Sequence, residues 1–472
     1  MKVDRRILLS GLAATAVLPL DSLIAAPPAA ISSVIADYVR NARVEDLPER
    51  VRKEVVRTFV NWMGVTIGGS RHESVGIAIA ALQPFFGRAE ADLVGRTERI
   101  DVLHAALING IASHVLDFDD THLKTIIHPA GPVVSAILPL AQRQKITGVE
   151  FLHALALGIE IECRIGNAIY PSHYDAGWHI TGSCGVFGST VAAGKLLGLD
   201  TQQLTCAIGI AASQPVGLKV QFGTMTKSFH VGRAAQNGLV AAMLAANGFT
   251  SDGTALEGKD GFAQATSKLA RWEEVTEGLG SRFEAALNTY KPFACGIVTH
   301  PAIDAAIQLR SAAQPLLEEI EAIELDANPL VLSLTGKTDP MTGLESKFSI
   351  YHCIAVGLLY GAAGEREFQD AIAIDPAVRR LRRTVTVRTD PSILARQCDL
   401  TIRFRNGTVL TRHVEHAVGS VENPLSDRAI DDKAVALANG VLAPNRVRRL
   451  LDECWALQRQ PDAGSLAVLA KA

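Results

Sequence analysis

Residues 149–169 read VEFLHALALGIEIECRIGNAI, and this stretch decides the class of fold. It is nearly apolar on every face of the helix that it would form. A helix of that kind lies inside a protein and does not face water. The alanine-rich stretch NGLVAAMLAANGF at 237–249 repeats the pattern. We therefore expect a bundle of closely packed, buried helices.

The helical pattern extends from residue 29 to about residue 278, with apolar residues three and four apart and Gly, Pro or Asn at the breaks. Residues 47–69, LPERVRKEVVRTFVNWMGVTIGG, place a proline at a first helical turn and end at a double glycine. This segment predicts one long helix.

Near residue 280 the pattern changes to strand-like alternation, interrupted by helical stretches such as FSIYHCIAVGLLYG. The last alternating stretch, DLTIRFRNGTVLTRHV, contains Asn406-Gly407, a strong signal for a hairpin turn. We predict a mainly α protein, with a large all-helical domain and a smaller α+β lid domain. The expected division is a signal segment at 1–28, the helical domain at 29–278, the α+β lid at 279–414, and C-terminal helices at 415–472 that return to the helical domain.

The bulk composition excludes several classes of protein. The chain has 472 residues, 48% of them apolar, and a net charge of -3. Without a long basic run, a nucleic-acid partner is not expected. The seven cysteines are odd in number, scattered and never spaced as CxxC, so they form neither a disulfide framework nor a zinc site. We interpret them as reduced, buried residues.

The N-terminus has the layout of a signal peptide. Arg5-Arg6 precede a mild apolar run from Ile7 to Leu20, which is too short for stable membrane insertion. The arginine pair followed by Ile-Leu-Leu resembles a twin-arginine export signal. Cleavage would fall near Ala25-Ala26, although the following proline disfavours that bond. We expect a periplasmic protein; the alternative is an N-terminal extension on a cytoplasmic one.

Residues 114–131, HVLDFDDTHLKTIIHPAG, concentrate acids and histidines in an apolar chain. Asp117, Asp120 and Thr121 would share one face if the helix continued through them. Alternatively, the helix ends there and His128 starts a loop. The metalloprotease spacing HExxH is absent, and three carboxylates do not by themselves specify a metal. Acid/base catalysis requires the same residue types, while a plain helix-end cluster is the alternative.

Further polar clusters follow along the chain. His179 precedes Gly182, Gly185 and Gly188, a spacing that favours close packing of a buried helix over a nucleotide loop. A lone histidine of this kind is more often structural.

The next two clusters contain cations. Lys227, His230 and Arg233 are three apart, which we interpret as one face opening an apolar helix. Either carboxylates form ion pairs with these cations, or this face of the helix is exposed to solvent. Lys291 and His300 flank a Cys-Gly turn at the seam between the two domains, where pockets tend to form; an ordinary linker is the alternative.

Taken together, these blocks resemble the MmgE/PrpD family, which includes 2-methylcitrate dehydratase, cis-aconitate decarboxylase and iminodisuccinate epimerase. The resemblance covers about residues 34 to 457. It rests on six blocks in order: DFDDTH with HPAG, GWHITGSCGVFGS, GTMTKSFHVGRAAQNG, KPFACGIVTHPAID, KFSIYHCIAVGLLYG and ENPLSD. It implies a helical domain closed by a lid, a homodimer, and catalysis without a metal or an organic cofactor.

The resemblance also implies the site residues. The family's active-site positions fall on Asp117, Thr121, His128, His179, Lys227 and Lys291. Relatives carry either tyrosine or histidine at the position of His352. We expect catalytic roles for Asp117, His128 and His179. The expected substrate-binding residues are Thr121, Lys227, Arg233, Lys291 and His352.

The family's shared step is the formation or quenching of a carbanion beside a carboxylate. Fixed cations stabilise such charge, and histidine transfers protons near neutral pH without a large pKa shift. We therefore expect a lyase of the 2-methylcitrate dehydratase type that acts on a small di- or tricarboxylate. The alternatives are an epimerase or decarboxylase of a related substrate, or an exported carboxylate-binding protein without turnover.

Overall fold

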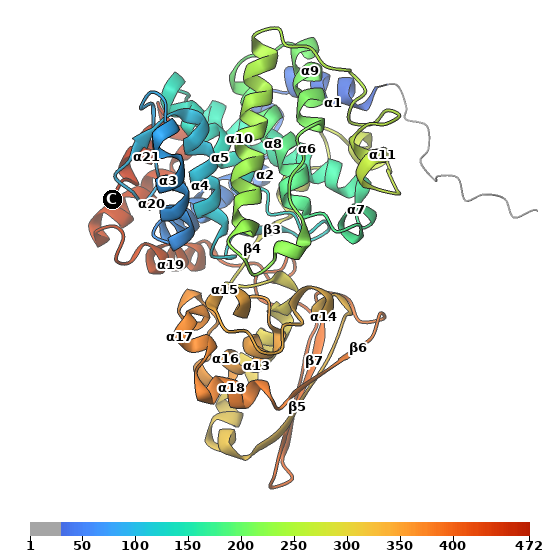
Figure 1. The fold of residues 1–472 in the computed structure, drawn as a ribbon, viewed down its shortest axis with the longest axis vertical. Helices are drawn as coiled ribbons and strands as arrows, with labels where there is room; N and C mark the ends of the chain where they lie inside the picture. The colour runs from blue at the N-terminus through green and yellow to red at the C-terminus, as the bar shows by residue number, and fades with distance from the viewer. Residues whose placement is uncertain (1–29) are drawn as a thin grey trace, which may run out of the picture.

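The structure, a computed structural model, describes residues 30–472. The expected signal segment at 1–28 therefore lies outside the described residues. As predicted, the protein is mainly α-helical with a small sheet region, and a helical part lies above a smaller α+β lid (Figure 1). Among residues 30–472, no helix combines the length and the apolar character that crossing a membrane would require.

The helical part forms around α6, α8 and α10, and α10 packs against both α8 and α4 (Figure 1). The stretch 149–169 is the greater part of α6 and is buried from Phe151 to Ile169, as the sequence predicts. The helices of this part are α1 (Ile31–Asn41), α2 (Glu49–Gly69), α3 (Glu73–Leu82), α4 (Val102–His114), α5 (Ala130–Gln144), α6 (Gly148–Ile169), α7 (Ser172–Asp175), α8 (Ile180–Leu196), α9 (Thr201–Ala212), α10 (Thr226–Ala246), α11 (Phe262–Thr266) and α12 (Glu273–Thr276).

The glycines of α8 allow neighbouring helices to approach closely. A Cβ on Gly185 would lie 2.5 Å from Cγ of Pro132, and one on Gly188 would lie 2.3 Å from Oε2 of Glu162. A Cβ atom does not approach a nonbonded atom that closely, so larger residues would push α5 and α6 away. The prediction that this spacing serves helix packing is confirmed.

The helical part also contains two small sheets. Strand β1 (Ala91–Asp92) pairs with β2 (Arg99–Ile100), and β3 (Asp120–His122) pairs with β4 (Asn288–Tyr290), both antiparallel. Helix α4 ends at His114, so the interpretation of Asp117, Asp120 and Thr121 as one helical face is wrong. Because β4 joins β3, the chain leaves the helical part after Tyr290 and not near residue 279.

The lid is a four-stranded sheet covered by helices. Its strands are ordered β6-β5-β7-β8, with β5 and β6 parallel and the other pairs antiparallel. The turn at Asn406-Gly407 joins β7 to β8 as predicted, and Gly407 has a φ of 84°. The strands are β5 (Ile320–Ala327), β6 (Val385–Thr389), β7 (Cys398–Phe404) and β8 (Val409–Val414); the helices are α13 (His300–Ala313), α14 (Leu330–Thr335), α15 (Gly343–Ser346), α16 (Ile350–Tyr360), α17 (Asp370–Ala373) and α18 (Pro376–Arg382).

The C-terminal helices pack against the helical part, beside its first helices (Figure 1). They are α19 (Asp427–Ala438), α20 (Pro444–Trp455) and α21 (Ser465–Leu469). Helix α19 lies on α2, where a Cβ on Gly64 would come within 2.6 Å of Cβ of Ala434. One apolar core therefore includes residues from both ends of the described chain.

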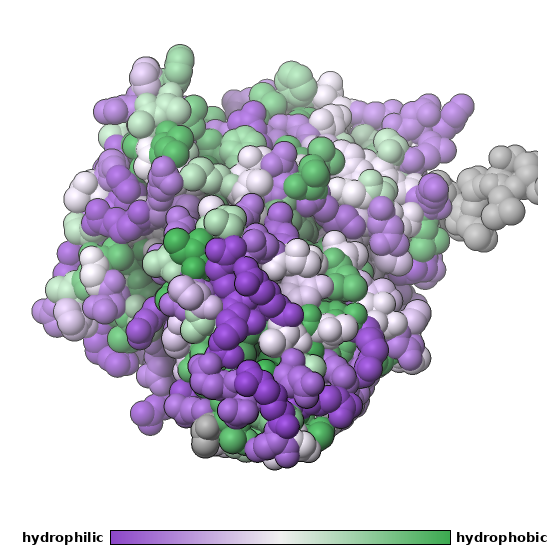
Figure 2. All heavy atoms as spheres, turned by 60° about the horizontal axis from the view of Figure 1, so that its bottom comes forward, coloured by the Kyte–Doolittle hydropathy of each residue, from purple (hydrophilic) through white to green (hydrophobic). Residues whose placement is uncertain are grey.

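The outer surface is mixed in character. Figure 2 turns the lid toward the viewer and shows mainly hydrophilic residues there, with apolar ones scattered among them. The cysteines are free, and all except the partly exposed Cys206 are buried, as expected from their spacing.

Candidate active site

Asp117 lies in the turn that follows α4 and is bound by two lysines. Its Oδ1 accepts hydrogen bonds from Nζ of Lys227 at 2.9 Å and from Nζ of Lys291 at 2.6 Å. Lys227 comes from the first turn of α10 and Lys291 follows β4, so three distant segments meet at one carboxylate. Asp117 has a φ of 51°, a left-handed conformation that is uncommon outside glycine and that concentrates at functional sites.

The three charged groups are buried, and the lysines determine how Asp117 titrates. Burial alone would raise the pKa of Asp117, but the ammonium groups of Lys227 and Lys291 outweigh burial and hold that pKa well below its usual value. Burial lowers the pKa of Lys227, with Asp117 opposing the shift. Oδ2 of Asp117 has no hydrogen-bond partner among the described residues, so it is free to meet a ligand.

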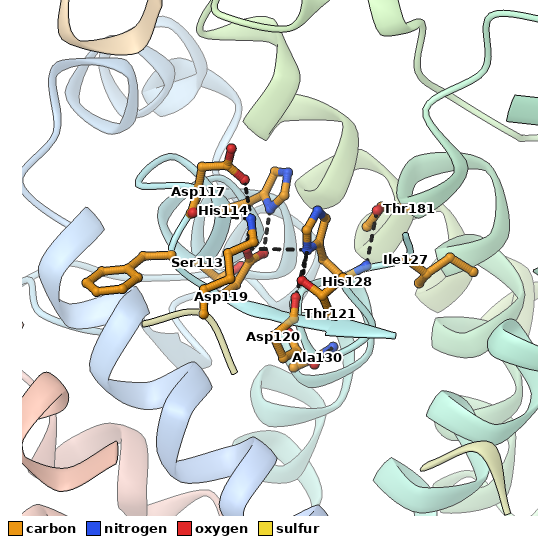
Figure 3. Close-up of polar contacts among 12 residues, drawn as sticks. Ser113, His114, Asp117, Asp119, Asp120, Thr121, Ile127, His128, Ala130 and Thr181 are labelled. Atoms are coloured by element: carbon orange, nitrogen blue, oxygen red, sulfur yellow. Dashed lines mark hydrogen bonds and ion pairs between the residues drawn. The ribbon is translucent and has the colours of Figure 1, made fainter. Parts of the chain in front are cut away.

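A second carboxylate, Asp119, lies between two histidine rings (Figure 3). Its Oδ2 is 2.5 Å from Nδ1 of His114, and its Oδ1 is 3.6 Å from Nδ1 of His128. Burial lowers the pKa of both histidines, so each is a neutral ring at pH 7. A neutral ring donates from only one nitrogen, and His114 therefore donates to Asp119 through Nδ1.

The tautomer of His128 follows from its partners. Its Nδ1 is 2.7 Å from the carbonyl oxygen of Asp120 and must donate to it, because a carbonyl only accepts (Figure 3). Oγ1 of Thr121 is 3.2 Å from the same nitrogen. The opposite nitrogen, Nε2, is therefore an acceptor, which suits a general base.

Asp120 holds the loop that carries His128 in position. Its carboxylate accepts hydrogen bonds from Nδ2 of Asn288 at 2.7 Å and from the backbone N of Ala130 at 3.0 Å. Burial, followed by the nearby charge of Asp119, raises the pKa of Asp120 to about 7. Asp120 thus ties β3 to β4 and to the start of α5, and so holds His128 in place.

Lys433 of the C-terminal helix α19 braces the same loops. Its Nζ donates to the carbonyl oxygens of Phe118 at 2.5 Å and Lys291 at 2.9 Å, and to Oδ1 of Asn61 at 2.8 Å. The helix that returns to the helical part therefore supports the chain on both sides of the Asp117–Lys291 contact.

His179 precedes α8 and contacts a further histidine, His230. Its Nδ1 is 3.0 Å from Nδ1 of His230, and its buried Nε2 has no partner among residues 30–472. The edge of its ring meets the ring of Phe222 with centroids 5.1 Å apart. Burial, then the charge of Lys227, holds the pKa of His179 well below 6.5, so His179 is also neutral.

These side chains surround one small cavity at the seam between the helical part and the lid. The sequence-predicted residues in its wall are Asp117, His128, His179, Lys227 and Lys291. The lid closes the cavity with Gly296, Ile297, Val298, Leu334, Thr335 and Phe348. Nζ of Lys347 binds the carbonyl oxygens of Leu116 at 2.8 Å and Ala294 at 3.0 Å, and so connects the lid to the turn before Asp117.

Comparison with known families matches both parts of the chain. The MmgE/PrpD N-terminal domain matches residues 33–275, and the MmgE/PrpD C-terminal domain matches residues 293–457. The chain belongs to the MmgE/PrpD family.

Curated relatives of this MmgE/PrpD protein are enzymes. The cis-aconitate decarboxylase of Aspergillus terreus is 27% identical over 470 residues, which cover 93% of this chain and 95% of the relative. Human cis-aconitate decarboxylase is 26% identical, with 93% and 94% covered. The 2-methylcitrate dehydratase of Cupriavidus necator is 24% identical over 395 residues, with 76% and 78% covered.

Three of the sequence-predicted residues do not line the cavity of this family member. Thr121 is buried behind His128 and contacts it. Arg233 is exposed and contacts Gln236, because six residues along α10 place it about 120° around the helix from Lys227. The one-face interpretation of this cluster is therefore wrong. His352 is buried inside the lid, where its Nε2 contacts the carbonyl oxygen of Glu367 at 2.9 Å.

The cluster His114, Asp117 and His128 has donor atoms within 4.8 Å of one another, the spacing of a metal site. The surrounding charges fit a metal poorly. Oδ1 of Asp117 already accepts from two lysines, whose charges would repel a divalent cation. His114 and His128 both carry their proton on Nδ1 and leave Nε2 as an acceptor, so the two lysines and not the histidines are what disfavours a metal. Proton transfer suits this arrangement better than metal binding.

The sequence did not single out His114, Asp119 or Lys433. His114 and Asp119 lie inside the quoted block 114–131, but nothing in their spacing separates them from its other two histidines and its other aspartates. Lys433 lies in an ordinary amphipathic helix, and no local pattern marks it.

Proposed function

We propose that this MmgE/PrpD protein is a lyase that removes CO2 from an unsaturated tricarboxylate related to cis-aconitate, without a metal ion. One observation carries the proposal: two buried lysines meet at Asp117 in a cavity that two neutral histidines, His128 and His179, also line. Cations held in place stabilise negative charge where it develops. Neutral histidines supply or accept protons near neutral pH.

The comparisons favour decarboxylation over dehydration as the first candidate. The decarboxylase of Aspergillus terreus is 27% identical over 93% of the chain, whereas the dehydratase of Cupriavidus necator is 24% identical over 76% of it.

The proposed reaction places charge beside the lysines. A carboxylate of the substrate binds near the ammonium groups of Lys227 and Lys291, which donate hydrogen bonds to it. The bond between carbon and the leaving CO2 breaks, and its electron pair spreads across the double bond toward the bound carboxylate. A proton from Nε2 of His179 then completes the product. Overall, the carboxylate and one proton become CO2 and a C–H bond.

Substrate binding requires the lid to move. The cavity beside Asp117 has about 30 Å³ of free space, whereas pockets for small organic ligands measure roughly 300–1,000 Å³. Ile297, Val298 and Phe348 belong to the lid and close the cavity from one side. We infer that the described conformation is the closed one, and that the substrate enters when these residues withdraw.

Dehydration of a 2-methylcitrate-like hydroxy acid is the second candidate. The observation that favours it is the tautomer of His128, whose acceptor Nε2 fits a base, opposite His179, whose Nε2 can carry the proton that a leaving hydroxyl needs. Epimerisation would use the same pair without a leaving group. A protein that only binds carboxylates has no use for a proton donor and acceptor placed in this way.

The deciding experiment is NMR of the purified protein in D₂O with a panel of di- and tricarboxylates. Decarboxylation predicts CO2 release from a cis-aconitate-like substrate, with deuterium in the product beside a carboxylate. Water loss from a hydroxy acid would identify the dehydratase instead. A folded protein that neither changes nor deuterates any member of the panel would overturn the proposal.

We also propose that the protein is exported and forms a homodimer. The leader sequence supports export, and the family resemblance supports the dimer. Replacing Arg5 and Arg6 by lysine should retain the protein in the cytoplasmic fraction, and an unchanged periplasmic fraction would overturn export. Light scattering on the purified protein tests the dimer directly, and a monomeric mass would exclude it.

A further inference from the structure

His230 contacts His179 and takes no part in the reaction as proposed so far. It lies on α10, one turn beyond Lys227, and its Nδ1 is 3.0 Å from Nδ1 of His179. Within residues 30–472 this is the one side-chain hydrogen bond that either ring makes. Since both atoms are ring nitrogens, one must carry the proton and the other must accept it.

A backbone hydrogen bond and two glycines hold the two rings in contact. The backbone N of His179 donates to the carbonyl oxygen of Gly217 at 3.0 Å. Gly217 has a φ of 109°, and a Cβ there would lie 3.0 Å from Nδ1 of His230. A Cβ on Gly182 would lie 3.1 Å from Cβ of His230. The two glycines thus leave just enough room for the His230 ring beside His179.

From residue 30 onward, no carboxylate contacts either ring to keep it protonated. Burial, then His114 and Lys227, lowers the pKa of His230 to about 4, and the pKa of His179 is lowered by burial and Lys227. Both rings are therefore neutral at pH 7, and each carries one proton. A neutral pair of this kind can pass a proton along without forming a buried charge.

Both side chains are buried, but the two rings differ at their Nε2 atoms. Nε2 of His179 is fully buried in the cavity wall. Nε2 of His230 makes no hydrogen bond within residues 30–472 and is not among the fully buried unpartnered atoms. The neighbouring Phe229 is 40% exposed, so this turn of α10 lies at the surface.

We propose that His230 relays a proton from solvent to His179 in each turnover. As Nε2–H of His179 passes to the substrate carbon, Nδ1–H of His230 passes to Nδ1 of His179, and a solvent proton binds Nε2 of His230. Both rings stay neutral and exchange tautomers. When the lid opens, water returns both rings to their starting tautomers with no net gain or loss of protons.

The inference rests on the proposed function, because decarboxylation consumes one proton per turnover and its site is closed. His230 is a positioning residue and proton relay; it does not touch the substrate. This role also explains why Lys227 and His230 lie one turn apart at the start of α10. Lys227 stabilises the developing negative charge, and His230 supplies the proton that His179 passes to the substrate carbon.

The test compares two substitutions of His230. In His230→Gln the amide can still donate to Nδ1 of His179 but cannot pass a proton through, so the structural contact survives and the relay does not. We expect kcat for CO2 release to fall by about 10²- to 10⁴-fold, the range of general acid–base catalysis, with KM unchanged. His413→Gln, which changes a half-exposed histidine in the lid, is the matched control.

His230→Ala leaves a ring-sized space for chemical rescue. Imidazole should restore turnover, whereas N-methylimidazole should not, because one of its ring nitrogens is blocked. Thermal unfolding of each variant shows whether it is folded. Near-normal kcat in His230→Gln, or equal rescue by both imidazoles, would overturn the relay. A wild-type protein that releases no CO2 from any substrate would instead refute the proposed function, and the relay with it.

Discussion

Replacing Lys291 by methionine tests the charge arrangement on which the proposed chemistry depends. Nζ of Lys291 donates to Oδ1 of Asp117 at 2.6 Å and to its carbonyl oxygen at 3.2 Å, and lies 3.5 Å from Oδ1 of Asp119. The side chain is fully buried. Methionine preserves the length and shape of lysine and removes its charge and its donors.

The structure sets the size of the expected effect. Removing one partner of a buried ion pair costs about 3–5 kcal/mol, because the other charge stays buried. Lys227 still binds Asp117 at 2.9 Å, so we expect a loss at the lower end, about 3 kcal/mol in the free energy of unfolding. For catalysis, removing one fixed donor from a developing negative charge lowers kcat by about 10²- to 10³-fold.

The assay pairs urea unfolding with CO2 release. Lys227→Met is the matched comparison, because Lys227 makes one hydrogen bond to Asp117 and retains slight exposure. We expect it to lose less stability than Lys291→Met and a similar amount of activity. The reasoning fails if Lys291→Met unfolds within about 1 kcal/mol of wild type, a typical effect for an exposed ion pair, or if it turns over normally.

Three further predictions follow from the site and its surroundings. If the protein is a dehydratase with Nε2 of His128 as its base, His128→Ala should lower turnover by about 10²- to 10⁴-fold in the NMR assay; decarboxylation gives His128 no proton to remove, so near-normal turnover would exclude dehydration. Arg233→Ala should leave KM and kcat unchanged, because the side chain is exposed and turned away from the cavity; a raised KM would show that it binds the substrate after all. Burial lowers the pKa of His173 and of His352 to about 4 in the folded protein. Their neutral rings therefore stabilise the fold above the unfolded pKa of 6.5, and this stability is lost as the pH falls toward 4. Between pH 7 and pH 5, each histidine should lower the free energy of unfolding by roughly 2 kcal/mol, so urea unfolding at the two pH values should show a smaller difference for His352→Gln than for wild type.

Much of the architecture could be predicted because it depends on local patterns. The apolar stretch of α6, the double glycine that ends α2, and the Asn406-Gly407 turn each specify a conformation through a few neighbouring residues. Asp117, His128, His179, Lys227 and Lys291 were predicted from motif blocks, and the structure brings these five around one cavity.

What could not be predicted depends on contacts between distant segments. Asp120 looks like a helical residue in the sequence, but pairing of its segment with residues 288–290 makes it a strand residue. The spacing of Arg233 from Lys227 already places it about 120° around α10, but only the packing of α10 on α4 and α8 decides which side of the helix faces the cavity. The importance of Lys433 arises only because α19 returns to lie beside the loops around Asp117.

The return of the C-terminal helices has a consequence for how the site opens. Because the chain enters the lid after Tyr290 and leaves it before Asp427 to rejoin α2, the lid is an insertion attached by two crossings at the same seam. A rigid domain that is attached at two points can rotate about the line that joins them, but it cannot translate along the seam. Proteolysis at either crossing should therefore not release the lid but free it to move in more directions. Such a nicked protein would retain both folded parts while losing the alignment that brings Lys347 and Phe348 against the turn carrying Asp117.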